Sequence, residues 1–144
     1  MAVAFEALEV GQEVFSVPKI VQREDVKAYA DASGDQNPLH QDDDFARSVG
    51  FPGIIAHGMF SMAHVVTALK DWVGSPAALR SIAVQFRAVV YMDETLVAKG
   101  RIASKDEANR EVTLDVWAEV ERDGETVKAI KNSRAVVRLD AGLE

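Results

Sequence analysis

The chain contains no cysteine, which excludes a disulfide-stabilised scaffold, a thiolate nucleophile and any zinc site with sulfur ligands. It also lacks an excess of basic residues, since 16 lysines and arginines stand against 23 acidic residues and the net charge is -7. A general nucleic-acid-binding protein needs a basic face to displace phosphate counterions, so that class is excluded. A local basic patch remains compatible with an anionic ligand.

The sequence also lacks a signal for a membrane or for secretion. The longest mainly apolar stretch, residues 51–73, contains Lys70 and Asp71, charges that a membrane span would not carry. The first residues include Glu6 and Glu9, and no basic segment precedes an apolar run as in a signal peptide. We therefore expect a cytoplasmic protein, and residues 1–144 are expected to form one domain.

Hydrophobic periodicity predicts an entry strand, three helices and then four strands. The longest helix is apolar on nearly all sides, which indicates that it is buried. After Ser75 the pattern changes to period two, and Asp123-Gly124 is typical of a hairpin turn. The four strands are expected to form an antiparallel meander wrapped around the long helix, an α+β fold. The expected ranges are 10–21 (strand), 23–32, 43–49 and 57–72 (helices), and 82–90, 95–103, 112–120 and 126–139 (strands).

Asp35 and His40 are the candidate catalytic pair. They lie five residues apart in the segment 34–40, which Pro38 excludes from regular structure. A turn there could place a carboxylate and an imidazole on opposite sides of one small molecule. Addition of water to a double bond needs such a pair, because one proton leaves water and another is delivered to carbon.

His57-Gly58 begins the long helix and is the candidate site for an oxyanion. The first amides of a helix have no partner inside the helix and lie at its positive end. Gly58 has no side chain to block the approach of a thioester carbonyl. Its amide could stabilise the enolate that develops there by about 3 kcal/mol, as other oxyanion donors do.

The stretch Ser33-Gly-Asp-Gln-Asn-Pro-Leu-His40, followed by Ala56-His-Gly-Met59, resembles the MaoC-like, R-specific enoyl-thioester hydratases. The resemblance covers nearly the whole chain and implies the hot-dog fold, an antiparallel sheet around a central helix. It implies hydration of trans-2-enoyl thioesters or dehydration of (R)-3-hydroxyacyl thioesters. Acyl-coenzyme A or acyl carrier protein would be the substrate, no metal or redox cofactor would be needed, and a homodimer or a heterodimer with a second hot-dog subunit is expected.

Carried over to this chain, the resemblance makes Asp35 and His40 catalytic and assigns the thioester oxygen to the Gly58 amide. Asn37 and Pro38 would shape the loop between the pair. The chain departs from members that carry a serine deeper in the central helix, because only two hydroxyl residues, Ser61 and Thr67, occur in that stretch.

Several of these residues also have simpler interpretations. His57 is interpreted as a capping or packing residue beside the substrate, and His64 as a core or interface residue, with no metal site expected between them. Met59 could line an acyl tunnel or pack in the core. Basic residues of the late strands could meet a cofactor phosphate, although most are expected to be surface charges: Arg80, Arg87, Lys131 and Arg134.

Two other functions stay open at this point. A hot-dog acyl-thioesterase would use a carboxylate to activate water at the carbonyl, and the Asp35…His40 pair argues against it. A subunit of a heterodimeric acyl-carrier-protein dehydratase would bind acyl thioesters with or without catalysing the reaction. Inactive subunits usually lack the pair, so its presence places this chain among the active ones.

Overall fold

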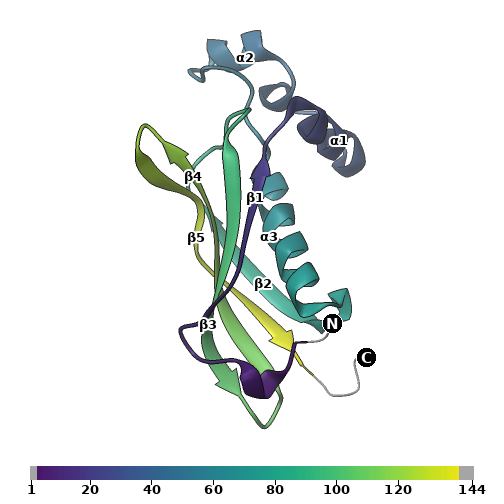
Figure 1. Cartoon of the computed structure of the whole chain (residues 1–144). Helices are drawn as coiled ribbons and strands as arrows, with labels where there is room; N and C mark the ends of the chain where they lie inside the picture. The colour runs from purple at the N-terminus through teal and green to yellow at the C-terminus, as the bar shows by residue number, and fades with distance from the viewer. Residues whose placement is uncertain (1–2, 140–144) are drawn as a thin grey trace.

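The period-two pattern of the C-terminal half forms the long strands of one sheet in the computed structural model, which describes residues 3–139 (Figure 1). The five strands all pair antiparallel, in the order β1-β3-β4-β5-β2. On β4 every second residue is buried, so one face of the sheet forms the core. The strands are β1 (Glu13–Ile20), β2 (Leu79–Phe86), β3 (Thr95–Asp106), β4 (Glu111–Arg122) and β5 (Glu125–Arg138).

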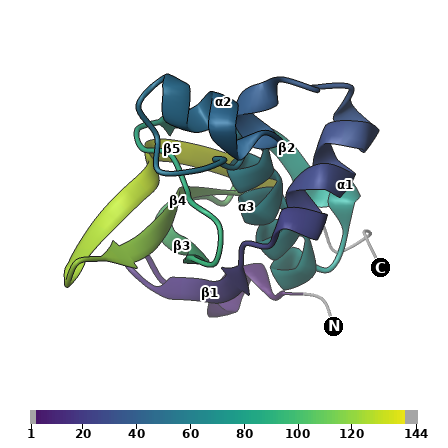
Figure 2. The same cartoon turned by 90° about the horizontal axis from the view of Figure 1, so that it is seen from above.

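The long helix α3 (Gly58–Val73) lies against the inner face of the sheet, which curves around it (Figure 2). Its residues Val65, Ala68 and Leu69 are almost completely buried against the sheet. The expected α+β hot-dog architecture is therefore confirmed. None of the helices within residues 3–139 is both long enough and apolar enough to cross a membrane.

The shorter helices surround the start of α3. Figure 1 shows α1 (Arg23–Ser33) and α2 (Asp43–Ser48) together at the end of the molecule where α3 begins. The remaining helical turns are 3-10 turns: η1 (Phe5–Ala7), η2 (Pro38–His40) and η3 (Pro76–Ala78). The segment 34–40 was expected to be irregular throughout, but Pro38 begins η2, because a proline at the first position of a helical turn loses no hydrogen bond.

The predicted four-strand meander was wrong in one respect. Only β3, β4 and β5 follow one another in the sheet, whereas β2 pairs with β5 and β1 pairs with β3. The strand predicted over 82–90 begins at Leu79 and ends at Phe86. Residues after Phe86 cross the end of the sheet instead, where the Ala56 amide donates to the Val90 carbonyl at 2.9 Å. Strand order depends on contacts between distant segments, which alternation along one segment does not encode.

The interpretation of α3 as a helix buried on all sides was also incomplete. Met59 is 51% exposed, and Ala63, Thr67 and Lys70 are exposed as well. The sheet of this chain covers one side of α3 and leaves the other side uncovered. Tight packing on the covered side extends to the sheet, where a Cβ atom on Gly100 of β3 would lie 2.4 Å from the Phe15 ring.

Candidate active site

Two side-chain-to-backbone turns shape the loop that carries the predicted catalytic pair. The Asp35 carboxylate accepts a hydrogen bond from the Asn37 amide at 3.2 Å, and the Asn37 side chain accepts from the Leu39 amide at 3.0 Å. Such Asx turns reverse the chain without a regular ladder. Pro38 then begins η2, and His40 ends it. The loop thereby turns Asp35 and His40 toward the same point.

The His40 imidazole has one defined hydrogen bond, between Nδ1 and the Ile55 carbonyl at 2.7 Å. A carbonyl oxygen can only accept, so Nδ1 carries the proton of this bond. In the neutral ring, Nε2 then has a free lone pair and can take a proton from water. The contact with Ile55 therefore sets both the orientation and the tautomer of His40.

His57 is the residue before α3 and supports both members of the pair. It is 2% exposed, and its ring stacks on the His40 ring with 3.7 Å between centroids. Its Nε2–H donates to the Asp35 main-chain carbonyl at 3.2 Å. Burial lowers the pKa of His57 below its ordinary value, and the neighbouring His40 adds to this effect. A neutral His57 is suited to packing against the pair and positioning it, and this role stays a prediction.

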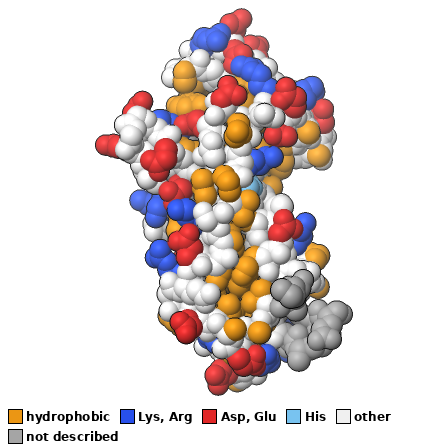
Figure 3. Space-filling view, in the orientation of Figure 1, with side chains coloured by type: hydrophobic (Ala, Val, Ile, Leu, Met, Phe, Trp, Pro, Cys, Tyr) orange, Lys and Arg blue, Asp and Glu red, His pale blue; other side chains and the backbone are white. Residues whose placement is uncertain are grey.

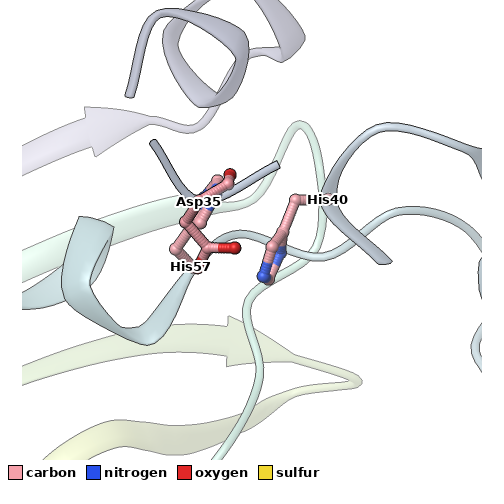
Figure 4. Close-up of side chains that lie close together, drawn as sticks. All are labelled: Asp35, His40 and His57. Atoms are coloured by element: carbon pink, nitrogen blue, oxygen red, sulfur yellow. The ribbon is translucent and has the colours of Figure 1, made fainter. Parts of the chain in front are cut away.

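Asp35, His40 and His57 form one cluster, in which a nitrogen or oxygen atom of each residue lies within 4.8 Å of the others. Figure 4 shows the three side chains converging from the η2 loop and from the start of α3. Three such groups could in principle bind a divalent ion. However, a histidine ligand points its lone pair in the plane of its ring, and the nearly parallel His40 and His57 rings, 23° apart, do not aim at one point. The arrangement favours acid–base chemistry over metal binding.

A cavity of about 300 Å³ opens beside the cluster and connects His40 to the start of α3. Its wall is mainly apolar and contains Ile55, Ala56, Gly58, Ser61, Val89 and Val90. Among the described residues, none accepts a hydrogen bond from the Gly58 amide, which lies at the first helical position. An apolar cavity with a base on one side and a free helix amide on another suits a carbonyl compound that undergoes proton transfer.

Comparison with known protein families finds one family to which this chain is similar over most of its length. The family model described as "MaoC like domain" matches residues 6–124. The chain belongs to the MaoC-like family. This membership bears out the resemblance of residues 33–40 and 56–59 to that family.

Two of the relatives of this MaoC-like chain match more than nine tenths of its length, and a third matches less than half of it. A 3-hydroxybutyryl-CoA dehydratase from Methylorubrum extorquens is 32% identical over 137 residues, which are 91% of this chain and 87% of that protein. The solved (R)-hydratase from A. caviae, involved in PHA biosynthesis, has a TM-score of 0.84 and 26% identity, and the match covers 94% of this chain and 99% of the other. The peroxisomal enoyl-CoA hydratase 2 of Arabidopsis thaliana is 39% identical over 69 residues, which are 46% of this chain and only 22% of that protein.

The other predicted site residues differ in whether they line the cavity. Gly58 lines the cavity with His40. Asn37 and Pro38 are exposed and act on the loop, consistent with the shaping role expected for them. The half-exposed Met59 is absent from the wall of this cavity and belongs to the uncovered side of α3. These roles in substrate binding stay predictions.

Ser61 of this MaoC-like chain has a placement that was not predicted from the sequence. It is 3% exposed and lines the same cavity as His40 and Gly58. The spacing in the sequence could have predicted this placement, because residues three apart on a helix share a face and Ser61 follows Gly58 by three. Thr67, the other hydroxyl considered, is exposed.

Gly58→Ala is expected to lower kcat/KM for an enoyl thioester about tenfold or more, since a misplaced reacting group loses orientation. A Cβ atom at Gly58 would lie 3.1 Å from the Phe86 ring and 3.4 Å or less from two more of its atoms. The added methyl must displace that ring or itself crowd the cavity. The measurement is steady-state hydration kinetics.

The matched control is the double variant Gly58→Ala/Phe86→Ala, in which the clashing ring is removed. Partial recovery of kcat/KM would assign the loss to the clash at the cavity mouth. A Gly58→Ala enzyme with wild-type kinetics would contradict the placement of the thioester at the Gly58 amide.

Acidification is expected to lower the free energy of unfolding from about pH 6.5 downward. Burial lowers the pKa of His57 and of His64, whose Nε2 lies 2.9 Å from the Val17 carbonyl, below the ordinary value of 6.5. In this pH range the unfolded chain binds more protons than the folded chain, so acid favours unfolding. Urea unfolding at pH 7.5 and pH 5.5 measures the change. His64→Gln should reduce the difference between the two pH values, and an unchanged difference would contradict the contribution of His64.

Proposed function

We propose that this chain is an (R)-specific hydro-lyase that hydrates trans-2-enoyl thioesters and dehydrates (R)-3-hydroxyacyl thioesters. The observation that carries the proposal is the His40 imidazole in one cavity with the Gly58 amide, where His40 Nε2 and this amide have no hydrogen-bond partner within residues 3–139. The family and the named activities of full-length relatives support it.

In hydration, the thioester oxygen would accept a hydrogen bond from the Gly58 amide at the positive end of α3. Asp35 and His40 would orient a water molecule, and its oxygen would bond to C3 while one of its protons passes to the pair. The electron pair of the double bond moves toward C2 and the carbonyl, where the helix amide stabilises the developing enolate. A proton delivered to C2 completes the 3-hydroxyacyl thioester, and dehydration reverses each step.

The same pair would position the attacking water and deliver the proton to C2. Asp35 and His40 lie on one short loop and their side chains converge (Figure 4), so both groups would act on one face of the double bond. This geometry supports syn addition, whereas the R configuration of the product is proposed from the family, in which a relative is named (R)-specific enoyl-CoA hydratase. The apolar wall of the cavity, including Ile55, Val89 and Val90, would receive the first carbons of the acyl chain.

The proposed active form is a pair of hot-dog subunits. β2 is an edge strand, and its terminal Phe86 is 48% exposed beside the catalytic cavity. An uncovered edge and an uncovered side of α3 are surfaces that a second subunit can bury. We also propose a cytoplasmic location, which is consistent with the absence of cysteine from the sequence.

The test is hydration of crotonyl-CoA and of a longer trans-2-enoyl-CoA by the purified chain, followed as loss of the enoyl-thioester absorbance. Chiral analysis should identify the product as the R-3-hydroxyacyl thioester. Release of free thiol without loss of the double bond would instead indicate a thioesterase. A folded protein that is inactive on every chain length would contradict catalysis by this chain alone and would favour a subunit of a heterodimer.

A further inference from the structure

A second and larger hollow lies on the outer face of the sheet, opposite α3. It has a volume of about 750 Å³, and we call it the basic groove. Four of its residues are basic, Arg87, Arg101, Lys128 and Lys131, and Asp115 is the one acidic residue in its wall as described. Figure 3 shows Lys and Arg side chains gathered over β4 and β5, on the left of the molecule. This concentration is unexpected in a chain with a net charge of -7.

The positive charges of the basic groove are not neutralised within the described part of the chain. The Asp115 carboxylate already forms an ion pair, at 3.1 Å, with Arg134, a residue that does not line the groove. None of the four basic groups forms an ion pair with a carboxylate of residues 3–139. Uncompensated positive charge in a concave surface attracts anions.

An aromatic ring holds two of these cations in place. The Arg101 guanidinium lies 5.3 Å from the centre of the Trp117 ring, and the Lys128 ammonium lies 5.2 Å from it. The Trp117 indole is itself oriented by a hydrogen bond to Glu119 at 2.7 Å. Cation–π contacts keep the charged groups near the ring without neutralising them.

A β-bulge in β5 forms another part of the groove wall. The register of β5 shifts against both β2 and β4 near Asn132, which has a φ of 51°. Ser133 repairs the interrupted ladder, because its hydroxyl accepts from the Gln85 amide at 2.9 Å and donates to the Lys131 carbonyl at 2.8 Å. Bulges are often used to redirect a side chain next to a site. Lys131, Asn132 and Ser133 all line the groove.

The groove adjoins the catalytic cavity. Arg87 and Ala88 line both hollows, and the Arg87 amide is tied to the Ala129 carbonyl of β5 at 2.8 Å. A thioester whose acyl group lies in the catalytic cavity can therefore extend past Arg87 into the groove. The phosphates of an acyl-coenzyme A lie at the far end of its pantetheine arm.

We infer that the basic groove binds the phosphates of the coenzyme A moiety of the substrate. The inference rests on the proposed function, because it assigns the carrier of that substrate. Coenzyme A brings several phosphates together, and these match several cations spread along one groove. The arm of an acyl carrier protein has a single phosphodiester, so most of the cations in the groove would have no phosphate to bind.

The test compares crotonyl-CoA with crotonyl-pantetheine, which has the same arm without phosphates. In the double variant Lys128→Gln/Lys131→Gln, KM for crotonyl-CoA should rise about tenfold, the loss expected for weakened charge-assisted hydrogen bonds. KM for crotonyl-pantetheine and kcat for both substrates should stay at wild-type values. The charge-matched control Lys19→Gln/Lys27→Gln, outside the groove, should leave KM unchanged for both.

An unchanged KM for crotonyl-CoA, or an equal rise for both substrates, would overturn the inference. A rise confined to a crotonyl thioester of acyl carrier protein would also overturn it, in favour of the protein carrier. If the wild type hydrates no thioester, the proposed function fails, and calorimetric titration with free coenzyme A and with pantetheine tests the groove separately. Tighter binding of coenzyme A that the double variant loses would support the groove, and equal binding would refute it.

Discussion

His40→Ala is expected to reduce kcat for hydration of crotonyl-CoA about 10²- to 10⁴-fold, the range typical of a lost general base. The variant removes the Nε2 lone pair, which the bond between Nδ1 and the Ile55 carbonyl leaves free for a proton. It also removes the ring that stacks on His57. Stopped-flow or steady-state loss of the enoyl absorbance measures the effect.

A second variant separates chemistry from folding. His40→Asn retains an N–H group that can donate to the Ile55 carbonyl but has no basic nitrogen, so it should be as inactive as His40→Ala. The matched control is His64→Gln, which alters a half-buried histidine on α3 and should retain wild-type kcat. Substantial activity in His40→Asn would show that the imidazole serves only to hold the loop.

Asp35→Asn is expected to reduce kcat by a similar factor, about 10²- to 10⁴-fold, because the carboxylate can no longer share a proton with the reacting water. The substitution keeps the shape of the side chain and an oxygen that can accept from the Asn37 amide, so the turn should persist. Kinetics with crotonyl-CoA and a circular dichroism melt together test this. Asp44→Asn is the control, because the Asp44 side chain is 96% exposed on α2.

The two groups are expected to act as a unit. If they do, the double variant Asp35→Asn/His40→Asn should be little slower than either single variant, since removing one member already abolishes the joint function. Multiplicative losses would mean that the groups act in independent steps. An Asp35→Asn enzyme with wild-type kcat would leave His40 as the single acid–base group.

Local features were predictable from the sequence because their causes lie within a few residues. Gly34 ends α1 in the left-handed conformation with a φ of 80°, and Asp42 caps α2 by accepting from the Phe45 amide. Asp123-Gly124 forms the hairpin turn between β4 and β5, with both residues at positive φ. Each feature depends on the conformational preference of one residue and its neighbours.

Features that join distant segments were not predictable in the same way. Alternation indicated that Ile82 belongs to a strand but not that this strand pairs with β5 beyond the meander. Periodicity predicts that the strand continues to residue 90, yet residues 88–90 follow the end of β2 and line the catalytic cavity. A hydrophobic pattern records that a residue is buried and does not record by which partner.

The sequence by itself determined the α+β fold class, the start of α3 and the loop that carries Asp35 and His40, because turn residues and periodicity act locally. Only the tertiary structure decided that His57 stacks on His40 while it holds the Asp35 carbonyl, and that Ser61 enters the same cavity. The basic groove, too, is evident only from the tertiary structure, because its residues come from β3, β4, β5 and the end of β2. These arrangements depend on strand order and on a register shift, which arise when segments far apart in the chain pack together.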